Sequence, residues 1–421
     1  MRRKTTSKTT YTLPIGPIHP AFKEPVMFEF EIDGEKIVDV DVSLGQVHRG
    51  IEWAGMQRNP IQILYLAERI CGICSFSHPI AFARAVENAA NIEVPERAEY
   101  LRVIHGELER IASHILWAGV AAHEIGFDSV LYLTWRMREK VLDLTEYLTG
   151  NRVTKAMITI GGVRRDITKD NIPKIRETLE YYKKNFEKLR HVFLDDKTIK
   201  LRSKNCGILT FEDALKLCAV GPTARASGVK KDVRVDQAYA AYGDLDIKHI
   251  TPDILTGEIN GDVYDRIVVR LLEVKQSIDL IEQCIDKMPS GDIVSEPKIP
   301  KLLSAIKKNA GEGIGRHEAP RGEVIHYVKL DGENEKPYTW KARAPTYNNI
   351  LPWIPMLKGE QIADIPIVAA STDPCISCTN RVLIINKKHR KIMSREQLHR
   401  LSVEKTRRLM KTHHIIGGGT I

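Results

Sequence analysis

The sequence predicts a predominantly helical α+β protein, in which a core bundle of long helices carries small antiparallel sheets at its periphery. Segments that begin near Glu96, Leu133 and Asp262 repeat apolar residues every three or four positions, the spacing of an amphipathic helix. A segment near the N-terminus alternates apolar and polar residues instead, which is typical of strands. No internal repeat or low-complexity linker divides the chain, so we expect a single domain over residues 1–381.

The first predicted element of that domain is a β-hairpin at about residues 26–45. Both Met27–Ile32 and Lys36–Val42 alternate apolar and polar residues, and Asp33-Gly34 between them is a common hairpin turn. A helical core is expected after the hairpin, at about 53–290, because the three amphipathic segments fall within it.

The last part of the domain, residues 291–381, is predicted to be mixed, because Gly and Pro interrupt it and Val324–Val328 is typical of a strand.

Two expectations concern the helical core. Val220–Arg225 contains Gly and Pro and is predicted to be a loop between helices. Cys218 and Cys284 lie in apolar helical settings, so we expect both to be buried packing residues.

Residues 382–421 form a basic C-terminal extension. They carry ten Lys or Arg and two Asp or Glu, a net charge of +8, whereas the whole chain has a formal charge of +9. The body of the protein is therefore nearly neutral, and binding to nucleic acid is not expected. Within the extension, the sequence predicts a strand at Val382–Asn386 and a helix over Ser394–Lys411, with Ser394 as its N-cap.

Cysteine usage and hydropathy indicate the compartment. Seven cysteines at wide and irregular spacings argue against a secreted disulfide framework and favour a reducing cytoplasm. No apolar segment follows the basic N-terminus, as a secretion signal would require. No apolar run reaches the roughly 18 residues of a membrane span, so membrane association is expected to come through partners.

Two C-x-x-C pairs lie at opposite ends of the chain, Cys71-Gly-Ile-Cys74 and Cys375-Ile-Ser-Cys378. This spacing lets two thiolates bind one metal centre, and folding can bring two such pairs together as a four-thiolate site. A chain of this length buries roughly 75% of its unfolded surface and needs no metal to hold its core. A metal at these cysteines is therefore expected to serve chemistry.

The spacing alone fits a structural four-cysteine zinc site as well as a catalytic metal. Asp373, which precedes the second pair, and His78, four residues after Cys74, are polar groups that can reach the sulfurs, and they favour the catalytic alternative. An iron–sulfur cluster is the third alternative, although the C-x-x-C-x-x-C runs typical of ferredoxins do not occur.

Two further residues are candidates for the site. Arg321 lies between Pro320 and Gly322, a setting that holds a guanidinium on a rigid loop and fixes a positive charge over a site, although a surface ion pair is the simpler alternative. Glu52 taken alone is typical of a carboxylate at a helix start.

Together, these motifs resemble a known family. Arg69-Ile-Cys71-Gly-Ile-Cys74-Ser-x-x-His78 and Asp373-Pro-Cys375-x-x-Cys378-x-x-Arg381 resemble the two signatures of nickel–iron hydrogenase large subunits. The details are similar to the energy-converting, membrane-bound branch, which is related to the 49-kDa subunit of respiratory complex I. Supporting motifs extend the resemblance over about residues 13–385, and they are Gly16-Pro17-Ile18-His19-Pro20, Arg49-Gly50-x-Glu52, Gly161–Arg164, Gly261–Arg266 and Glu318–Glu323.

The resemblance implies a cofactor and its ligands. Cys71 and Cys375 would be terminal nickel ligands, whereas Cys74 and Cys378 would bridge nickel to an iron that also carries carbon monoxide and cyanide. Soft thiolates suit both metals. No iron–sulfur cluster is expected in this chain itself.

The resemblance also implies roles for the remaining candidates. Cys375 would pass a proton to Glu52, and Arg321 would lie over the metals as electrostatic support, since a guanidinium is hard to deprotonate. His78 would donate a hydrogen bond to a cysteine sulfur, and Asp373 would anchor either the Arg321 loop or the second cysteine pair.

The function implied is that of the single catalytic domain of an energy-converting hydrogenase complex, which interconverts dihydrogen with protons and electrons. The expected partners are a small subunit with a proximal four-iron iron–sulfur cluster, a ferredoxin-like subunit, antiporter-like membrane subunits that translocate ions, and maturation proteins. The complex would lie on the cytoplasmic side of the cell membrane. Residues 382–421 would either be removed by a maturation endopeptidase or dock on an acidic partner surface.

Two departures and two alternatives accompany the resemblance. Asn380 stands where related sequences often carry an acidic residue, and Arg381 stands where the soluble members carry histidine. A complex-I-like subunit of a quinone or sulfur-compound reductase without nickel is one alternative, against which the full set of four cysteines counts. A non-catalytic electron-transfer subunit with a zinc or iron–sulfur site is the other, and it would leave Glu52 and Arg321 without a role.

Overall fold

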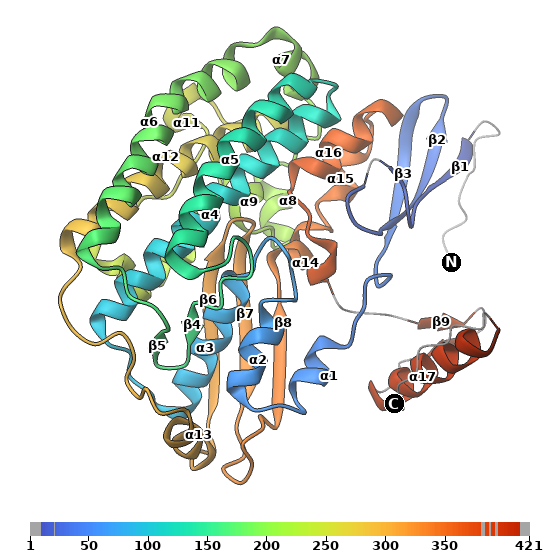
Figure 1. The fold of residues 1–421 in the computed structure, drawn as a ribbon. Coiled ribbons are helices and arrows are strands. Elements are labelled where there is room, and N and C mark those ends of the chain that lie inside the picture. The colour runs from blue at the N-terminus through green and yellow to red at the C-terminus, as the bar shows by residue number, and fades with distance from the viewer. Residues whose placement is uncertain (1–9, 21, 380–383, 387–388, 392–394, 413–421) are drawn as a thin grey trace.

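A computed structural model describes residues 10–20, 22–379, 384–386, 389–391 and 395–412. Long helices form a bundle at one end of a three-stranded sheet, and a second three-stranded sheet lies beside the bundle near the N-terminus (Figure 1). All paired strands are antiparallel. The predicted fold class, a helical α+β protein with antiparallel sheets, is confirmed.

Four long helices make up the bundle, namely α4 (Glu96–Glu124), α5 (Asp128–Thr149), α6 (Ile172–Asp195) and α12 (Val263–Lys287). The central member is α4, which packs against both α5 and α12. Its first turn carries Glu96 and Glu99, which stabilise the positive end of the helix dipole. Its predicted apolar positions, including Leu101, Ile104 and Leu108, are buried. The periodicity in the sequence thus identified α4, α5 and α12 as helices.

The N-terminal sheet has the order β1 (Thr10–Ile15), β2 (Met27–Asp33) and β3 (Lys36–Ser43). The predicted hairpin is β2–β3, and Gly34 in its turn has a φ of 60°. Phe28 and Phe30 on β2 are fully buried, and the Phe28 ring packs against Trp353. One face of this sheet therefore joins the core.

The second sheet has the order β6 (Glu312–Ala319), β7 (Gly322–Lys329) and β8 (Thr339–Arg343), and helix α3 (Ser77–Ala90) crosses it. Gly313 and Gly315 on β6 allow this close approach, because a Cβ at Gly315 would lie 1.9 Å from the carbonyl oxygen of Ala81 on α3. Ala319 pairs with Gly322, so Pro320 and Arg321 form the tight turn between β6 and β7. The sheet thereby carries Arg321 into the interior.

Shorter elements complete the body. The helices are α1 (Ile51–Gly55), α2 (Pro60–Ala67), α7 (Lys197–Ser203), α8 (Phe211–Lys216), α9 (Gly221–Ala226), α10 (Val233–Asp236), α11 (Asp253–Thr256), α13 (Ile299–Lys307), α14 (Pro345–Asn349), α15 (Trp353–Leu357) and α16 (Ile365–Ser371). Two-residue strands β4 (Ile158–Thr159) and β5 (Gly162–Val163) pair with each other, and the 3-10 turns are Lys169–Asn171, Ala240–Asp244, Ile362–Asp364 and Ile376–Cys378.

Two expectations about this region were wrong. Val220–Arg225 is not a loop, because the chain turns at Gly221, whose φ is 66°, and Pro222 then begins α9. Cys284 is buried on α12 as expected, but Cys218 is exposed. Cys218 lies just past the end of α8 with a φ of 55°, so the chain leaves the helix there and carries the side chain outwards.

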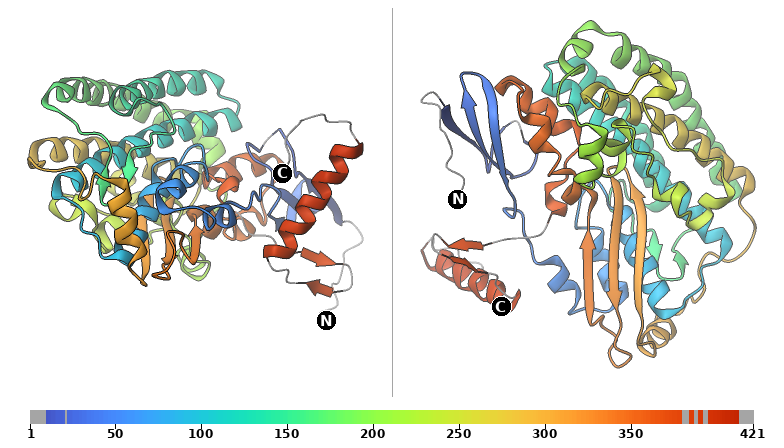
Figure 2. Two further views of the ribbon diagram at one scale, coloured as in Figure 1. Left: turned by 60° about the horizontal axis from the view of Figure 1, so that its bottom comes forward. Right: turned by 180° about the vertical axis from the view of Figure 1, so that it is seen from behind.

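The C-terminal extension contains β9 (Ile384–Asn386), β10 (His389–Lys391) and α17 (Arg395–Thr412). In every view α17 lies on the same side of the molecule as the N-terminal sheet (Figure 1, Figure 2). The His399 ring of α17 stacks on Trp53 of α1, with ring centroids 4.4 Å apart. The predicted strand and helix are present, whereas residues 382–383 and the predicted cap Ser394 lie outside the described residues.

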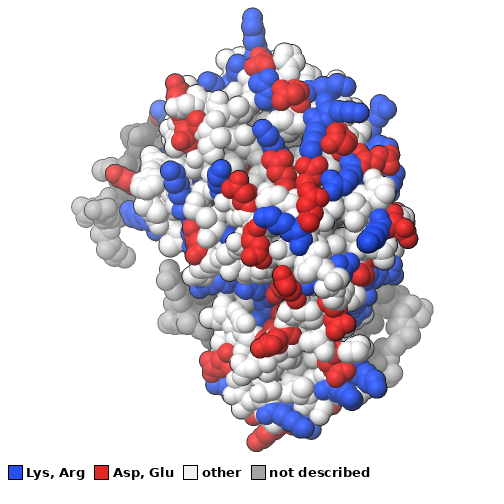
Figure 3. All heavy atoms as spheres, turned by 90° about the vertical axis from the view of Figure 1, so that its left-hand side faces the viewer, with Lys and Arg blue, Asp and Glu red and all other residues white. Residues whose placement is uncertain are grey.

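The surface of the body carries both signs of charge. On the face that Figure 3 shows, basic and acidic side chains are interspersed rather than gathered into one basic patch. Among the described residues, no helix is long and apolar enough to cross a membrane.

Candidate metal centre

The first cysteine pair lies between α2 and α3. Asn59 caps α2 in a reciprocal arrangement with Gln62, and the helix ends before the loop that carries Cys71. The Glu109 carboxylate of α4 accepts hydrogen bonds from the backbone N–H groups of Phe76 (2.6 Å) and Ser77 (3.1 Å) at the start of α3. The loop is therefore fixed at both ends, and a buried carboxylate holds the helix that follows it.

The second pair follows α16. Asp373 has a φ of 54°, a left-handed conformation that aspartate tolerates better than most residues. The backbone N–H of Cys375 donates to Thr346 Oγ1 (3.1 Å), and the N–H of Cys378 donates to the carbonyl of Cys375 (3.1 Å) in a 3-10 turn. The turn directs both cysteine side chains to one side.

Arg49 joins the two cysteine loops. Its guanidinium donates to the carbonyls of Arg69 (2.9 Å) and Ile70 (2.5 Å) in the first loop and to that of Ser377 (3.2 Å) in the second. The sequence marked Arg49 only as part of the Arg49-Gly50-x-Glu52 motif and gave no signal of this role. A single side chain thus fixes the separation of segments that lie far apart in the sequence.

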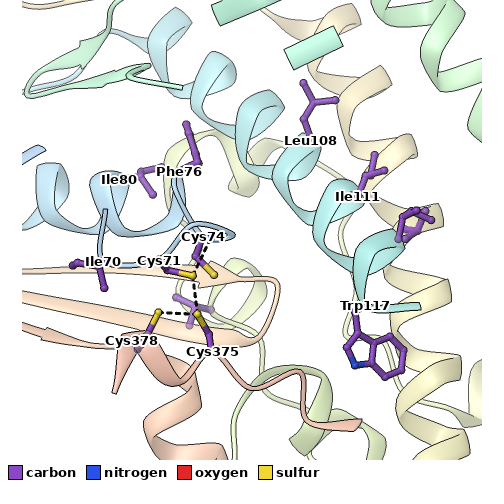
Figure 4. Packing of buried hydrophobic residues seen from close by; sticks show 14 of the residues in the cluster. Ile70, Cys71, Cys74, Phe76, Ile80, Leu108, Ile111, Trp117, Cys375 and Cys378 are labelled. Atoms are coloured by element: carbon purple, nitrogen blue, oxygen red, sulfur yellow. Dashed lines mark hydrogen bonds between the residues drawn. The ribbon is translucent and has the colours of Figure 1, made fainter. Parts of the chain in front are cut away.

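The four cysteine side chains converge in the interior (Figure 4). The Sγ atoms of Cys71 and Cys375 are 2.7 Å apart, and those of Cys375 and Cys378 are 3.2 Å apart. All four cysteines are free and buried. The sulfur atoms of Cys71, Cys375 and Cys378 lie within 4.8 Å of one another. Soft sulfur donors from two loops therefore surround a common point.

The cysteines share protons unevenly. Hydrogen bonds from the thiols of Cys375, Cys378 and Cys74 lower the pKa of Cys71 well below its usual value, and burial opposes this effect. The hydrogen bonds with Cys375 and Cys71 raise the pKa of Cys74 well above its usual value. The sulfur of Cys71 is therefore the one on which the surrounding hydrogen bonds favour the thiolate.

Arg321 lies against the sulfurs. One guanidinium nitrogen donates to Cys74 Sγ (3.4 Å) and to Ser113 Oγ (3.0 Å), while the other two donate to the Asp373 carboxylate (2.6 Å) and the Asp373 carbonyl (2.8 Å). Burial disfavours the charge, but Asp373 and the cysteines keep the pKa of Arg321 well above its usual value. The expected contact between Asp373 and the Arg321 turn is present, and the other carboxylate oxygen of Asp373 is buried without a partner.

A buried ion-pair network holds the turn that carries Arg321. Arg110 of α4 donates to the carbonyls of Glu318 (2.5 Å) and Ala319 (3.3 Å), and Arg225 of α9 donates to the Glu318 carboxylate (2.9 Å). A Cβ at Gly221 would lie 2.4 Å from the carbonyl oxygen of Arg321, so only glycine fits there. The members of the network are Glu107, Arg110, Arg225, Asp232, Arg234, Glu273 and Glu318.

His78 approaches the cluster from α3. Its Nε2 lies 3.5 Å from Cys378 Sγ, and its Nδ1 lies 3.1 Å from Nε2 of His326. Burial lowers the pKa of His78 to about 4, so the ring is neutral. The expected contact between His78 and a cysteine sulfur is therefore present, with Cys378 as the partner.

A cavity of about 330 Å³ borders the cluster. Its walls include Cys71, Cys375, Arg321 and Asp373, together with the carboxylate of Glu24. Structural zinc sites are closed, whereas catalytic centres keep an open side, so this cavity favours a catalytic centre over a structural one. The donor set of four thiols fits nickel and iron.

Glu52 contacts β8 and does not line this cavity. Glu52 lies on α1, and its carboxylate accepts hydrogen bonds from the backbone N–H of Ala342 (2.9 Å) and from Lys341 Nζ (3.2 Å) on β8. Glu52 is not among the residues that line the cavity, whereas Glu24 lines it and accepts a hydrogen bond from the backbone N–H of Ser377 (3.1 Å). Sequence reasoning missed Glu24, which precedes a proline in a segment without a recognisable pattern. Asn380 and Arg381 lie outside the described residues.

Comparisons with known proteins agree with this geometry. The family model of the respiratory-chain NADH dehydrogenase 49 Kd subunit matches residues 124–381, and that of nickel-dependent hydrogenase matches residues 49–118. The chain is 49% identical over 399 residues to the membrane-bound hydrogenase subunit alpha of Pyrococcus furiosus, covering 94% of this chain and 93% of the relative. It is 40% identical over 380 residues to the carbon monoxide-induced hydrogenase of Rhodospirillum rubrum, covering 89% of this chain and 100% of the relative.

A solved structure is also similar. A chain of the membrane-bound sulfane sulfur reductase, an archaeal respiratory membrane complex, superposes with a TM-score of 0.82 at 30% sequence identity. The match covers 89% of this chain and 99% of that one. The chain therefore belongs to the family that comprises nickel-dependent hydrogenase large subunits and the 49-kDa subunit of respiratory NADH dehydrogenase.

Proposed function

We propose that this protein is the catalytic subunit of an energy-converting, membrane-bound hydrogenase complex, which interconverts dihydrogen with protons and electrons. The observation that carries the proposal is the convergence of four buried thiols from two loops (Figure 4), with Arg321 beside Cys74 and with Cys71 and Cys375 at the wall of a cavity. The high identity to a membrane-bound hydrogenase subunit from Pyrococcus furiosus supports the same activity.

Cys71, Cys74, Cys375 and Cys378 would hold a nickel–iron centre whose iron carries carbon monoxide and cyanide. When bound, this centre supplies the heterolytic cleavage of dihydrogen. The protein contributes a buried, thiolate-rich cage whose two halves Arg49 holds at a fixed separation. Because metal binding replaces the thiol protons, loading the site would release protons from the cysteines.

Arg321 would act as a fixed positive charge beside the sulfurs. Its contacts with Asp373 and Ser113 hold the guanidinium in one orientation, and its raised pKa opposes a role as the proton acceptor. In this low-dielectric setting the guanidinium would stabilise negative charge that develops at the centre without any rearrangement. Asp373 positions Arg321, as the resemblance implies.

Two carboxylates are candidates for the proton acceptor. The resemblance implies Glu52, whereas the cavity geometry supports Glu24, which lines the same cavity as Cys375 and contacts the second cysteine loop. A proton leaving the Cys375 sulfur would reach Glu24 through the cavity, with Ser377 Oγ, 3.5 Å from that sulfur, as a first step.

A pair of matched variants tests this choice. If Glu24 accepts the proton, Glu24→Gln retains nickel but lowers hydrogen–deuterium exchange by roughly 100-fold, because a positioned acid–base group contributes at least that much. Glu52→Gln then leaves exchange close to the wild-type rate. The opposite ranking of the two variants would assign the proton to Glu52 and remove Glu24 from the path.

The proposed partners follow from the chemistry and the relatives. The four cysteines that converge are all assigned to the nickel–iron centre, so electrons would leave through a small subunit with a proximal four-iron cluster and then a ferredoxin-like subunit. Antiporter-like membrane subunits would couple this transfer to ion translocation at the cytoplasmic side of the membrane. Maturation proteins would insert the metals, and an endopeptidase could act on residues 382–421.

One observation favours a second function. The likeness to a membrane-bound sulfane sulfur reductase, at 30% identity, supports a complex-I-like reductase of sulfur compounds or quinones without nickel. Both functions would use the same cavity beside Cys71 and Cys375.

An infrared spectrum of the complex, purified without oxygen from its native host, decides between the two. Metal-bound carbon monoxide and cyanide absorb where proteins do not, so a hydrogenase shows bands in that window and contains nickel by elemental analysis. An intact complex with neither bands nor nickel, but with sulfur-reducing activity, would establish the reductase instead.

A further inference from the structure

The geometry points to a one-way hydrogen-bond relay, Trp340 to His326 to His78, that makes the sulfur of Cys378 a hydrogen-bond acceptor. His326 and Trp340 are thus positioning residues for the metal centre, and neither was suggested by the sequence. This inference rests on the proposed function, because Cys378 is taken to be a ligand of the iron.

The relay begins at a group that can only donate. Trp340 lies on β8, and its Nε1–H donates to Nδ1 of His326 on β7 at 3.0 Å. An imidazole nitrogen that accepts a hydrogen bond carries no proton, so His326 is neutral and its only N–H is on Nε2. The indole therefore selects one tautomer of His326.

The same logic fixes the next ring. Nε2 of His326 lies 3.1 Å from Nδ1 of His78, so the N–H of His326 donates and Nδ1 of His78 accepts. The N–H of His78 must then be on Nε2, which faces Cys378 Sγ at 3.5 Å. The reverse order, from a Cys378 thiol to the histidines, would place two protons between Trp340 and His326 and is excluded.

The surroundings protect this order. His78, His326 and Trp340 are all buried, and the Phe82 ring packs edge-on against both His326 and Trp340. Burial lowers the pKa of His326 well below its usual value, and the neighbouring His78 adds to this effect, in agreement with a neutral ring. A second proton on either histidine would therefore lack a partner and carry a desolvation cost.

The relay has a chemical consequence. A hydrogen bond to a thiolate withdraws electron density from the sulfur, so the relay would make Cys378 a weaker electron donor to the iron. It also bars His78 from taking up a proton at Nε2, so His78 is not the proton acceptor of the centre. Neither His78, His326 nor Trp340 lines the cavity.

The infrared spectrum of Trp340→Phe in the assembled complex tests the relay. Without the indole N–H, the tautomers of both histidines are no longer fixed, and the donation to Cys378 is weakened. More electron density on the iron then shifts the carbon monoxide band of the variant to lower frequency than in the wild type. Nickel content is measured on the same sample, so that loss of the centre is not mistaken for a shift.

Phe82→Leu is the matched control. It disturbs packing against the same His326 and Trp340 rings but leaves every hydrogen bond of the relay in place, so its band should stay at the wild-type position. His326→Gln offers rescue, because its amide can accept from Trp340 and donate to His78, and we expect an unshifted band. His326→Phe should shift the band as Trp340→Phe does.

The outcomes separate the relay from the proposed function. A wild-type complex without bands would refute the hydrogenase assignment, whereas wild-type bands that Trp340→Phe and His326→Phe leave unmoved would refute the relay alone. If Trp340→Phe does not assemble, nitrogen-15 spectra of the full-length wild-type chain, labelled at histidine, decide the matter. They should show His78 with its proton on Nε2, and a proton on Nδ1 would overturn the relay.

Discussion

Two buried polar regions meet at the turn between β6 and β7, and they are built in opposite ways. On one side, every member of the ion-pair network has a partner of opposite charge, for example Glu273, which contacts Arg225 (2.6 Å) and Arg110 (3.5 Å). On the other side, the cysteine centre gathers four thiols and leaves a carboxylate oxygen of Asp373 without a partner.

This difference distinguishes buried polar groups that stabilise the fold from buried polar groups that bind a ligand. A buried network that satisfies itself gains nothing from a ligand, so its role is to hold α4, α9, α12 and the Arg321 turn together. A cluster of converging donors beside a cavity is incomplete until something binds. The comparison predicts that substitutions in the cysteine centre abolish metal binding but leave the stability of the fold unchanged. Substitutions in the ion-pair network should instead destabilise the fold without removing a metal ligand.

The largest effect is expected for Cys375→Ser. Serine keeps the size of the side chain but replaces a soft sulfur donor with a hard, weakly coordinating hydroxyl. Nickel per chain should fall to near zero by elemental analysis, while the denaturation midpoint of the metal-free full chain stays close to the wild-type value. Cys284→Ala on α12 is the control and should retain nickel, since Cys284 is buried away from the centre. If Cys375→Ser retained nickel, the cysteine centre would not be the metal site, and the contrast between the two regions would be wrong.

The next effect is expected in the network, for Glu273→Gln. Removing this charge leaves the guanidinium of Arg225 buried with less compensation, so the free energy of unfolding should fall by roughly 3–5 kcal/mol. Glu282→Gln, on the same helix, removes a partially exposed partner of Lys183 and should cost at most about 1 kcal/mol. Chemical denaturation of the full chain measures both values. Equal losses in the two variants would show that the network is not the stabilising element.

The smallest effect is a pH dependence at Glu318. Burial and the neighbouring Asp232 raise the pKa of Glu318 from 4.5 to about 7, against the opposing influence of the arginines in the network. Between pH 4.5 and pH 7, Glu318 keeps its proton in the folded chain but has released it in the unfolded chain. The stability from this proton is therefore present below pH 4.5 and lost as the pH rises through 7.

Glu318→Gln should remove this dependence, because glutamine does not titrate. The difference in unfolding free energy between variant and wild type should change by up to about 3 kcal/mol in favour of the variant between pH 4.5 and pH 8. Denaturation curves at several pH values measure the difference. A constant difference across that range would mean that Glu318 is already ionised in the folded protein.

Much of the centre could be recognised from the sequence because its residues cluster there. The two C-x-x-C pairs, His78 four residues after Cys74, and Asp373 two residues before Cys375 lie in short motifs, so local spacing revealed them. Arg321 was recognisable because Pro320 and Gly322 mark a tight turn. These residues converge in the structure, as expected.

Other residues gave no such signal. Arg49, Glu24 and His326 each contact a residue that lies far away in the sequence, and Trp340 acts through His326 on the neighbouring strand. Glu52 lies in a recognisable motif, yet its carboxylate contacts β8 rather than the cavity. Local spacing cannot predict which distant strand or loop a side chain will meet.

By itself, the sequence determined three long helices of the bundle, the N-terminal hairpin, the fold class and the four cysteines that converge, because periodicity and motif spacing are local properties of the chain. Only the tertiary structure decided which residues outside those motifs support the sulfurs. The ion-pair network, the Arg49 link, the cavity with Glu24 and the relay from Trp340 all join segments that are distant in sequence. Their energies depend on burial and on hydrogen-bond direction, and both are defined only once the chain has folded.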